Sequence, residues 1–100
     1  MEYLVRMRVD LPSDLDPDFV ATLLEQEREY SHHWQRTGKW TGLWRIVGEW
    51  ANYSVFDVED NDELHQILSG LPLFPYLEIS VTPLAAHPSW LGDSEPEARG

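Results

Sequence analysis

The sequence has no cysteine, few basic residues and no long apolar run. Without cysteine, a disulfide framework, a thiolate nucleophile and a cysteine-based zinc site are excluded, and a reducing cytoplasm is the expected compartment. Seven Lys and Arg stand against eighteen Asp and Glu, a formal net charge of −11. This balance argues against nucleic acid and anionic membrane surfaces as partners, because both are bound mainly through Lys and Arg. No segment approaches the roughly 20 apolar residues of a membrane span, and the N-terminal residues lack the layout of a secretory signal.

Aromatic residues, in contrast, are abundant, with five Trp, four Tyr and three Phe in 100 residues. Such side chains form cores, pocket walls or interfaces. A chain of this length makes one small domain, so self-association is a plausible source of further burial. We expect the domain to cover residues 1–90 and residues 91–100 to form a flexible acidic tail.

Hydrophobic periodicity predicts the element order β-α-β-β-α-β. Apolar and polar side chains alternate in the strands, Asp16-Pro17 is a helix start, and Asp60 with Glu63 is a capping-box pattern. The predicted elements are a strand over 2–10, a helix over 17–37 stopped by Gly38, a strand opening near Gly42 and Trp44, a turn over 49–52, a strand over 53–58, a short helix from Asp60 to Gly70, and a strand around 77–81. This order is that of the α+β ferredoxin-like fold, an antiparallel four-stranded sheet with two helices on one face.

The first predicted helix carries a carboxylate on its apolar face. Positions 23, 27, 30 and 34 follow one face of a helix, and position 27 is Glu among Leu, Tyr and Trp. Burial of a carboxylate is unfavourable unless the group is paired or its pKa rises. A Glu27 with a raised pKa would be a usable proton-transfer group. The alternatives are that Glu27 forms a structural ion pair with an Arg, or reaches water from the edge of the apolar stripe.

Arg45 interrupts the strand that follows. Strand alternation places it on one face with Leu43, Val47 and Glu49. If that face lies under the helices, Arg45 and Glu27 could meet in one polar cavity, where an Arg can bind a carboxylate in bidentate fashion. A structural pair between sheet and helix is the competing interpretation.

The four histidines do not form a metal-binding pattern, because none pairs with another at the i, i+4 spacing of a helical zinc site. An exposed or hydrogen-bonded structural role is the ordinary interpretation of each. His33 and His65 are the two that we retain as possible acid–base or substrate-binding groups.

The sequence WRIVGEWANYSVFDV, followed by NDELHQILSGLPLFPYLEISVTPLAAHPS, resembles the muconolactone Δ-isomerase family. The resemblance runs from LVRMRVDLPSDLDP to His87-Pro88 with almost no change in length, and ANYSVFDV with GLPLFPY is its most specific part. It implies a cytoplasmic, ferredoxin-like homo-oligomer, a decamer in the family, that needs no cofactor and serves the β-ketoadipate pathway of aromatic compound catabolism.

The resemblance also implies the family's reaction, in which the double bond shifts within a lactone ring and converts muconolactone into 3-oxoadipate enol-lactone. A base removes a ring proton, the charge spreads into a dienolate, and a proton returns at another ring carbon. This chemistry needs a carboxylate of raised pKa and a cation or donor for the developing oxyanion. Glu27 and Arg45 stand at positions that match the family's pattern, which implies that they are the catalytic pair. Glu49 lies near the predicted turn, where a surface or interface position is the alternative to a place in the pocket.

One position departs from the pattern, because members of this family tend to carry Lys where this chain has Leu24. The loss of that charge favours a bulkier or less anionic substrate, and so do His33, Trp34 and the additional Trp50 and Trp90. We expect Trp34 and Tyr30 to help form the wall of the substrate pocket. The alternative functions are therefore a relative that isomerises or cyclises a polycyclic or polyketide metabolite, one that dehalogenates a chlorinated lactone, and a non-enzymatic binding or assembly protein. The last is disfavoured by Glu27 on the apolar face.

Overall fold

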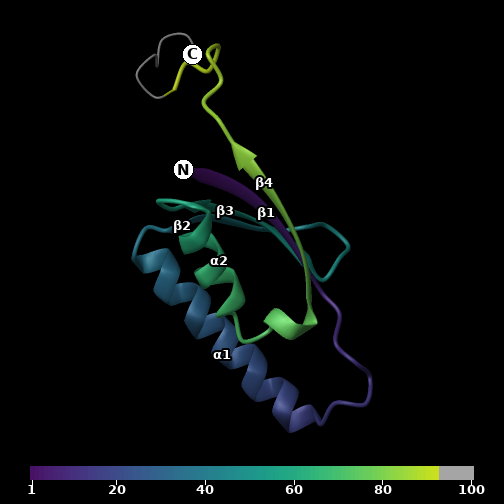
Figure 1. Ribbon diagram of the computed structural model, residues 1–100. Helices are drawn as coiled ribbons and strands as arrows, with labels where there is room; N and C mark the ends of the chain where they lie inside the picture. Colours follow the sequence, from purple (N-terminus) through teal and green to yellow (C-terminus); the bar gives the residue numbers. More distant parts are fainter. Residues whose placement is uncertain (93–100) are drawn as a thin grey trace.

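The computed structural model describes residues 1–92 and shows two helices on one face of a four-stranded antiparallel sheet (Figure 1). The elements are β1 (Glu2–Val9), α1 (Pro17–Arg36), β2 (Trp40–Arg45), β3 (Ala51–Asp57), α2 (Asn61–Ser69), the 3-10 turn η1 (Phe74–Tyr76) and β4 (Leu77–Leu84). The strand order is β2-β3-β1-β4 with every neighbouring pair antiparallel, which confirms the predicted ferredoxin-like fold. Most of the expected acidic tail, residues 93–100, lies outside the described residues.

The ends of both helices follow from their local sequence. Pro17 stands in the first turn of α1, and Gly38 follows its end with a φ of +79°, the left-handed conformation that glycine adopts without strain. At the start of α2, the Asp60 side chain accepts a hydrogen bond of 2.8 Å from the Glu63 N–H. The Glu63 carboxylate in turn accepts from the Glu59 N–H at 2.8 Å. The predicted capping box is therefore present, except that the return hydrogen bond comes from Glu59 and not from the N-cap residue Asp60.

The turn between β2 and β3 begins about three residues earlier in the sequence than predicted, so the predicted bounds of 49–52 were wrong. The chain turns over residues 46–50, and β3 begins at Ala51. Gly48 has a φ of +80°, and the Ile46 N–H donates to the Ala51 carbonyl at 3.0 Å to close the loop. Gly48 can adopt this left-handed conformation without strain, and it was therefore the residue that marks the turn. The alternation of the residues around it had concealed this signal.

The core lies between the sheet and α2. Tyr3, Val5 and Met7 of β1 face the helices together with Phe56 of β3, and they pack against a stripe on and after α2. That stripe consists of Leu64, Ile67, Leu68 and Leu71.

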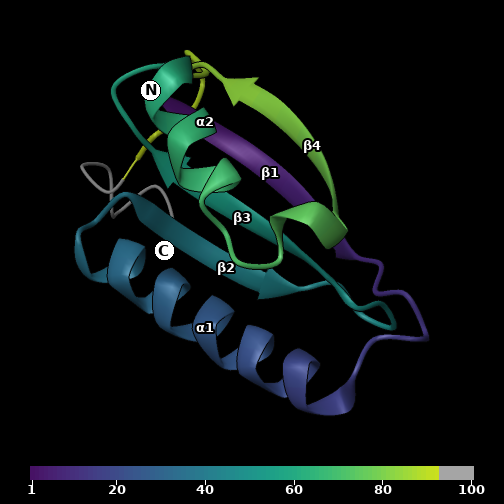
Figure 2. The same ribbon diagram turned by 60° about the horizontal axis from the view of Figure 1, so that its bottom comes forward.

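The helix α1 contributes much less to this core. It runs alongside β2, whereas α2 covers the middle of the sheet (Figure 2). Leu23 is its one buried residue, and Tyr30 and Trp34 are half-buried against the rim of the core. This loose contact leaves space between α1 and the β2–β3 edge of the sheet.

Candidate active site

Two cavities occupy the space under α1, and both are lined by Glu27, Leu43 and Asn52. The first, of about 280 Å³, is also lined by Val9, Arg45, Trp50 and Ala51. The second, of about 350 Å³, is also lined by Leu24, Arg28, Ser31, His32, Gln35 and Trp40. Glu27, Leu43 and Asn52 therefore contact both cavities, which are adjacent.

Glu27 is a half-buried carboxylate held by one backbone hydrogen bond. Its Oε1 accepts from the Leu73 N–H at 3.0 Å, so the buried loop after α2 fixes the direction of the side chain. Burial raises the pKa of Glu27, and the Leu73 N–H opposes that shift only in part. Among residues 1–92 no Lys, Arg or His forms an ion pair with Glu27, so the ion-pair interpretation does not hold in this structure.

Arg45 is the last residue of β2 and lines the first cavity with Glu27. The register places Leu43 opposite the fully buried Ser54 and Arg45 opposite Asn52, so these side chains share the face under the helices. In the described part of the chain the Arg45 guanidinium has no carboxylate partner. Arg45 is therefore an exposed positive charge that lines the cavity without a counter-ion among residues 1–92.

Glu49 does not share that face, contrary to the prediction from strand alternation. It lies in the turn after β2, and its carboxylate pairs with Arg6 at 2.6 Å. Arg6 alternates with the core residues Val5 and Met7, which places this ion pair on the open face of the sheet. Alternation failed here because the chain leaves strand geometry at Ile46.

Three predicted substrate-binding residues of α1 lie in different surroundings. Leu24 lines the second cavity at its outer edge, with 37% of its surface exposed. Tyr30 donates its hydroxyl to the Ile67 carbonyl at 2.7 Å and thereby ties α1 to α2. Trp34 packs edge-to-face on Tyr30 against the core, and neither aromatic residue lines the Glu27 cavities.

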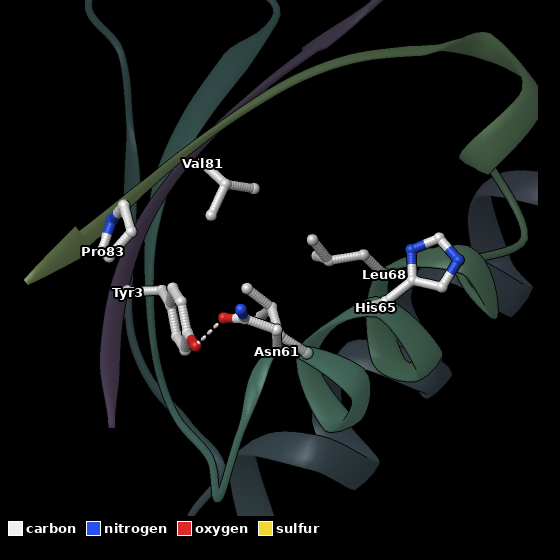
Figure 3. Close-up of a pocket in the computed structure, with 7 residues that line it drawn as sticks. Tyr3, Asn61, His65, Leu68, Val81 and Pro83 are labelled. Atoms are coloured by element: carbon white, nitrogen blue, oxygen red, sulfur yellow. Dashed lines mark hydrogen bonds between the residues drawn. The ribbon is translucent and has the colours of Figure 1, made fainter.

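The structure separates the two predicted histidines from Glu27. His33 is exposed and stacks edge-to-face on Trp34, while its neighbour His32 lines the second cavity. His65 lines a third cavity of about 240 Å³ between α2 and β4, at the side opposite Tyr3 (Figure 3). There the Tyr3 hydroxyl donates to the Asn61 side-chain carbonyl, and the remaining walls are formed by Leu64, Leu68, Val81 and Pro83.

Asn52 and His32 are two polar lining residues, among several lining residues, that sequence reasoning missed. A signal for Asn52 was available, since Asn52, Ser54 and Phe56 alternate in β3 and two polar groups therefore face the helices. Residues 1–92 contain no cluster of three metal-binding side chains. Within the same range, no helix is long and apolar enough to cross a membrane.

A family model described as muconolactone delta-isomerase matches residues 1–90. The chain belongs to the muconolactone Δ-isomerase family. It is 52% identical to muconolactone Δ-isomerase 1 of Acinetobacter lwoffii over 95% of this chain and 99% of that protein. It is 56% identical to muconolactone Δ-isomerase of Cupriavidus pinatubonensis over 89% and 97% of the two chains.

A crystal structure of muconolactone isomerase superposes on this chain with a TM-score of 0.87 at 48% identity, covering 91% of this chain and 95% of that one. The names of these three proteins specify one and the same isomerase, and none of them supports the alternative of a repurposed substrate. The family membership that the sequence motifs predicted is therefore confirmed.

Proposed function

We propose that this member of the muconolactone Δ-isomerase family isomerises muconolactone to 3-oxoadipate enol-lactone without a cofactor. Muconolactone is an α,β-unsaturated lactone, so its ring C–H at the γ carbon is acidified through the double bond. Removal of that proton gives a dienolate, and return of a proton to the α carbon completes the double-bond shift. The reaction is a proton transfer with no net loss or gain of atoms or electrons.

The observation that carries this proposal is Glu27, a carboxylate with a raised pKa that lines a cavity and has no cationic partner within residues 1–92. A general base is most effective when its pKa lies near the working pH. Glu27 takes the ring proton in its ionised form and returns it in its neutral form. The Leu73 N–H holds one oxygen in place, which leaves the other oxygen for the substrate.

Arg45 supplies the positive charge for an anionic substrate. The protein carries a net charge of −11, which by itself repels a carboxylate-bearing lactone. The Arg45 guanidinium lines the cavity and has no carboxylate partner within residues 1–92, so it offsets this repulsion locally and can bind a carboxylate in bidentate fashion.

We further propose that the active form is a cytoplasmic homo-oligomer, a decamer as in the family pattern. Large apolar side chains are exposed on the single subunit, and the exposed fractions of Trp44 and Val47 are 59% and 95%. Trp44 and its strand partner Tyr53 lie side by side on the open face of the sheet. An exposed apolar surface of this kind is typical of a subunit interface.

The proposal is tested by incubating the purified protein with muconolactone in deuterated water without added metal or cofactor. We expect enol-lactone with deuterium at the α carbon, or partial retention of hydrogen if Glu27 returns the same proton. Prior treatment with a chelator should leave the rate unchanged. Absence of turnover of muconolactone, with turnover of a chlorinated or polycyclic lactone instead, would overturn the assignment.

A further inference from the structure

A hydrogen bond between two polar residues of β3 determines which end of the Asn52 amide faces the Glu27 cavities. The Ser54 hydroxyl donates to the Asn52 Oδ1 at 2.8 Å. Ser54 has no exposed surface, so its hydroxyl has no access to water and the bond to Asn52 satisfies its donor. With Oδ1 engaged by Ser54, the Asn52 NH2 group is the end left for another partner.

That NH2 group has no acceptor within residues 1–92, and Asn52 lines both cavities that Glu27 lines. Asn52 also lies opposite Arg45 across the β2–β3 ladder. A hydrogen bond from a half-buried amide donor to an acceptor is stabilising, and it is more stabilising when the acceptor is charged. The acceptor that fits this place is an oxygen of a molecule bound beside Glu27.

We infer that the Asn52 NH2 group donates to the lactone carbonyl oxygen and stabilises the dienolate, with Ser54 as the positioning residue that aims it. This inference rests on the proposed function. The substrate presents two oxygen sites of different charge, a permanent carboxylate and a carbonyl that becomes an oxyanion only during the reaction. The exposed guanidinium of Arg45 suits the permanent charge, whereas a neutral, oriented donor suits the developing one.

The neutrality of Asn52 gives it a catalytic rather than a binding role. A neutral amide binds the ground-state carbonyl weakly and the oxyanion strongly, so its contribution falls on the transition state. Because Ser54 fixes the amide in advance, the donor does not need to reorient as the charge develops. The expected kinetic signature is a lower kcat with a small change in KM when this donor is removed.

The test compares kcat and KM on muconolactone for Asn52→Ala, Ser54→Ala and the double variant. Removal of one oxyanion donor typically costs about 10²- to 10³-fold in kcat, and we expect Asn52→Ala to fall in that range with KM changed by less than about tenfold. Ser54→Ala should lower kcat by about tenfold in the wild type and have no further effect in the Asn52→Ala background, since it acts through Asn52. Equal losses in both backgrounds would assign Ser54 a purely structural role.

Asn52→Asp provides a second variant of nearly the same shape. Its carboxylate cannot donate and repels the dienolate, so kcat should fall at least as far as in Asn52→Ala. It also adds a negative charge near Glu27, which should raise the pKa seen in the kcat profile. Ser80→Ala, on the exposed face of β4 away from the cavities, is the matched control and should behave like the wild type.

The outcomes separate the two proposals. A wild type without activity on muconolactone removes the proposed function itself. An active wild type with Asn52→Ala and Asn52→Asp both within about threefold of its kcat, far less than the loss of an oxyanion donor, overturns the role of Asn52 alone. If Asn52→Ala does not fold, as judged by its thermal melt, Asn52→Asp and Ser54→Ala decide the question.

Discussion

Replacement of Glu27 by Gln should reduce activity and increase stability, a combination that few residues outside an active site would produce. The amide cannot accept the ring proton at neutral pH, so kcat should fall by about 10²- to 10⁴-fold, the scale of a positioned acid–base group. At about 1.36 kcal/mol per tenfold, this loss equals roughly 2.7–5.5 kcal/mol in the activation barrier.

The sign of the stability effect follows from the raised pKa of Glu27, whose main cause is burial. A carboxyl group whose folded-state pKa exceeds its unfolded value stabilises the protein fully below the unfolded pKa. This stabilisation is lost as the pH rises through the folded-state pKa. Gln stays neutral throughout and keeps an oxygen that can accept from the Leu73 N–H. The variant should therefore match the wild type below about pH 4, near the unfolded pKa of Glu, and exceed it at higher pH.

The gap in the free energy of unfolding should widen by about 1.36 kcal/mol per pH unit between the two pKa values and then level off. Urea unfolding at one fixed subunit concentration, from pH 4 to pH 8, measures this gap alongside the activity of the same samples. Glu29→Gln, two residues away on the exposed side of α1, is the control and should show no gap that grows with pH. A Glu27→Gln variant that is less stable than the wild type at pH 8, or that retains near-normal turnover, would refute the reasoning.

Two further predictions follow from the cavity edge and the exposed apolar surface. Leu24→Lys places an ammonium group at the outer edge of the second cavity. Because solvent partly screens this charge, we expect kcat/KM on muconolactone to rise by only about tenfold. The nearby cation should also lower the pKa seen in the rate profile, and the control Leu24→Met should change neither quantity. Unchanged kinetics in Leu24→Lys would mean that the departure from the family's Lys is silent. Light scattering at micromolar concentration should report a particle well above a dimer, and a monomer would contradict the proposed assembly.

The fold could be predicted from local sequence because its signals agree with one another. Alternation marked β1 and β4, Gly38 ended α1, and Asp60 with Glu63 began α2. The loop between β2 and β3 was misplaced because the charged and aromatic residues around it still alternate, while the decisive feature is the left-handed Gly48. Local patterns thus located the elements, and the backbone conformation of one residue set the register between two of them.

The candidate site was predictable only where the chemistry of a residue conflicts with its position. Glu27 interrupts an apolar helix face and Arg45 interrupts a strand, so both were predicted, and both line the first cavity. His33 and His32 differ by about 100° around the helix, and a small error in the placement of α1 over the sheet exchanges their roles. Tyr30 and Trp34 share the face of Glu27, but the position of α2 gives them packing partners there. That position is a tertiary contact that no local pattern encodes.

The two helices contribute differently to this domain: α2 packs on the core, and α1 covers the cavities that Glu27 lines. α2 buries Leu64, Ile67 and Leu68 against the sheet and supplies most of the helical part of the core. α1 can therefore rest on the sheet mainly through Leu23 and the rim contacts of Tyr30 and Trp34, which leaves room beneath it. In that room a carboxylate is buried enough for its pKa to rise, yet open enough to meet a ligand. A tighter α1 would fill the cavity, and a looser one would hydrate Glu27 and return its pKa to the ordinary value.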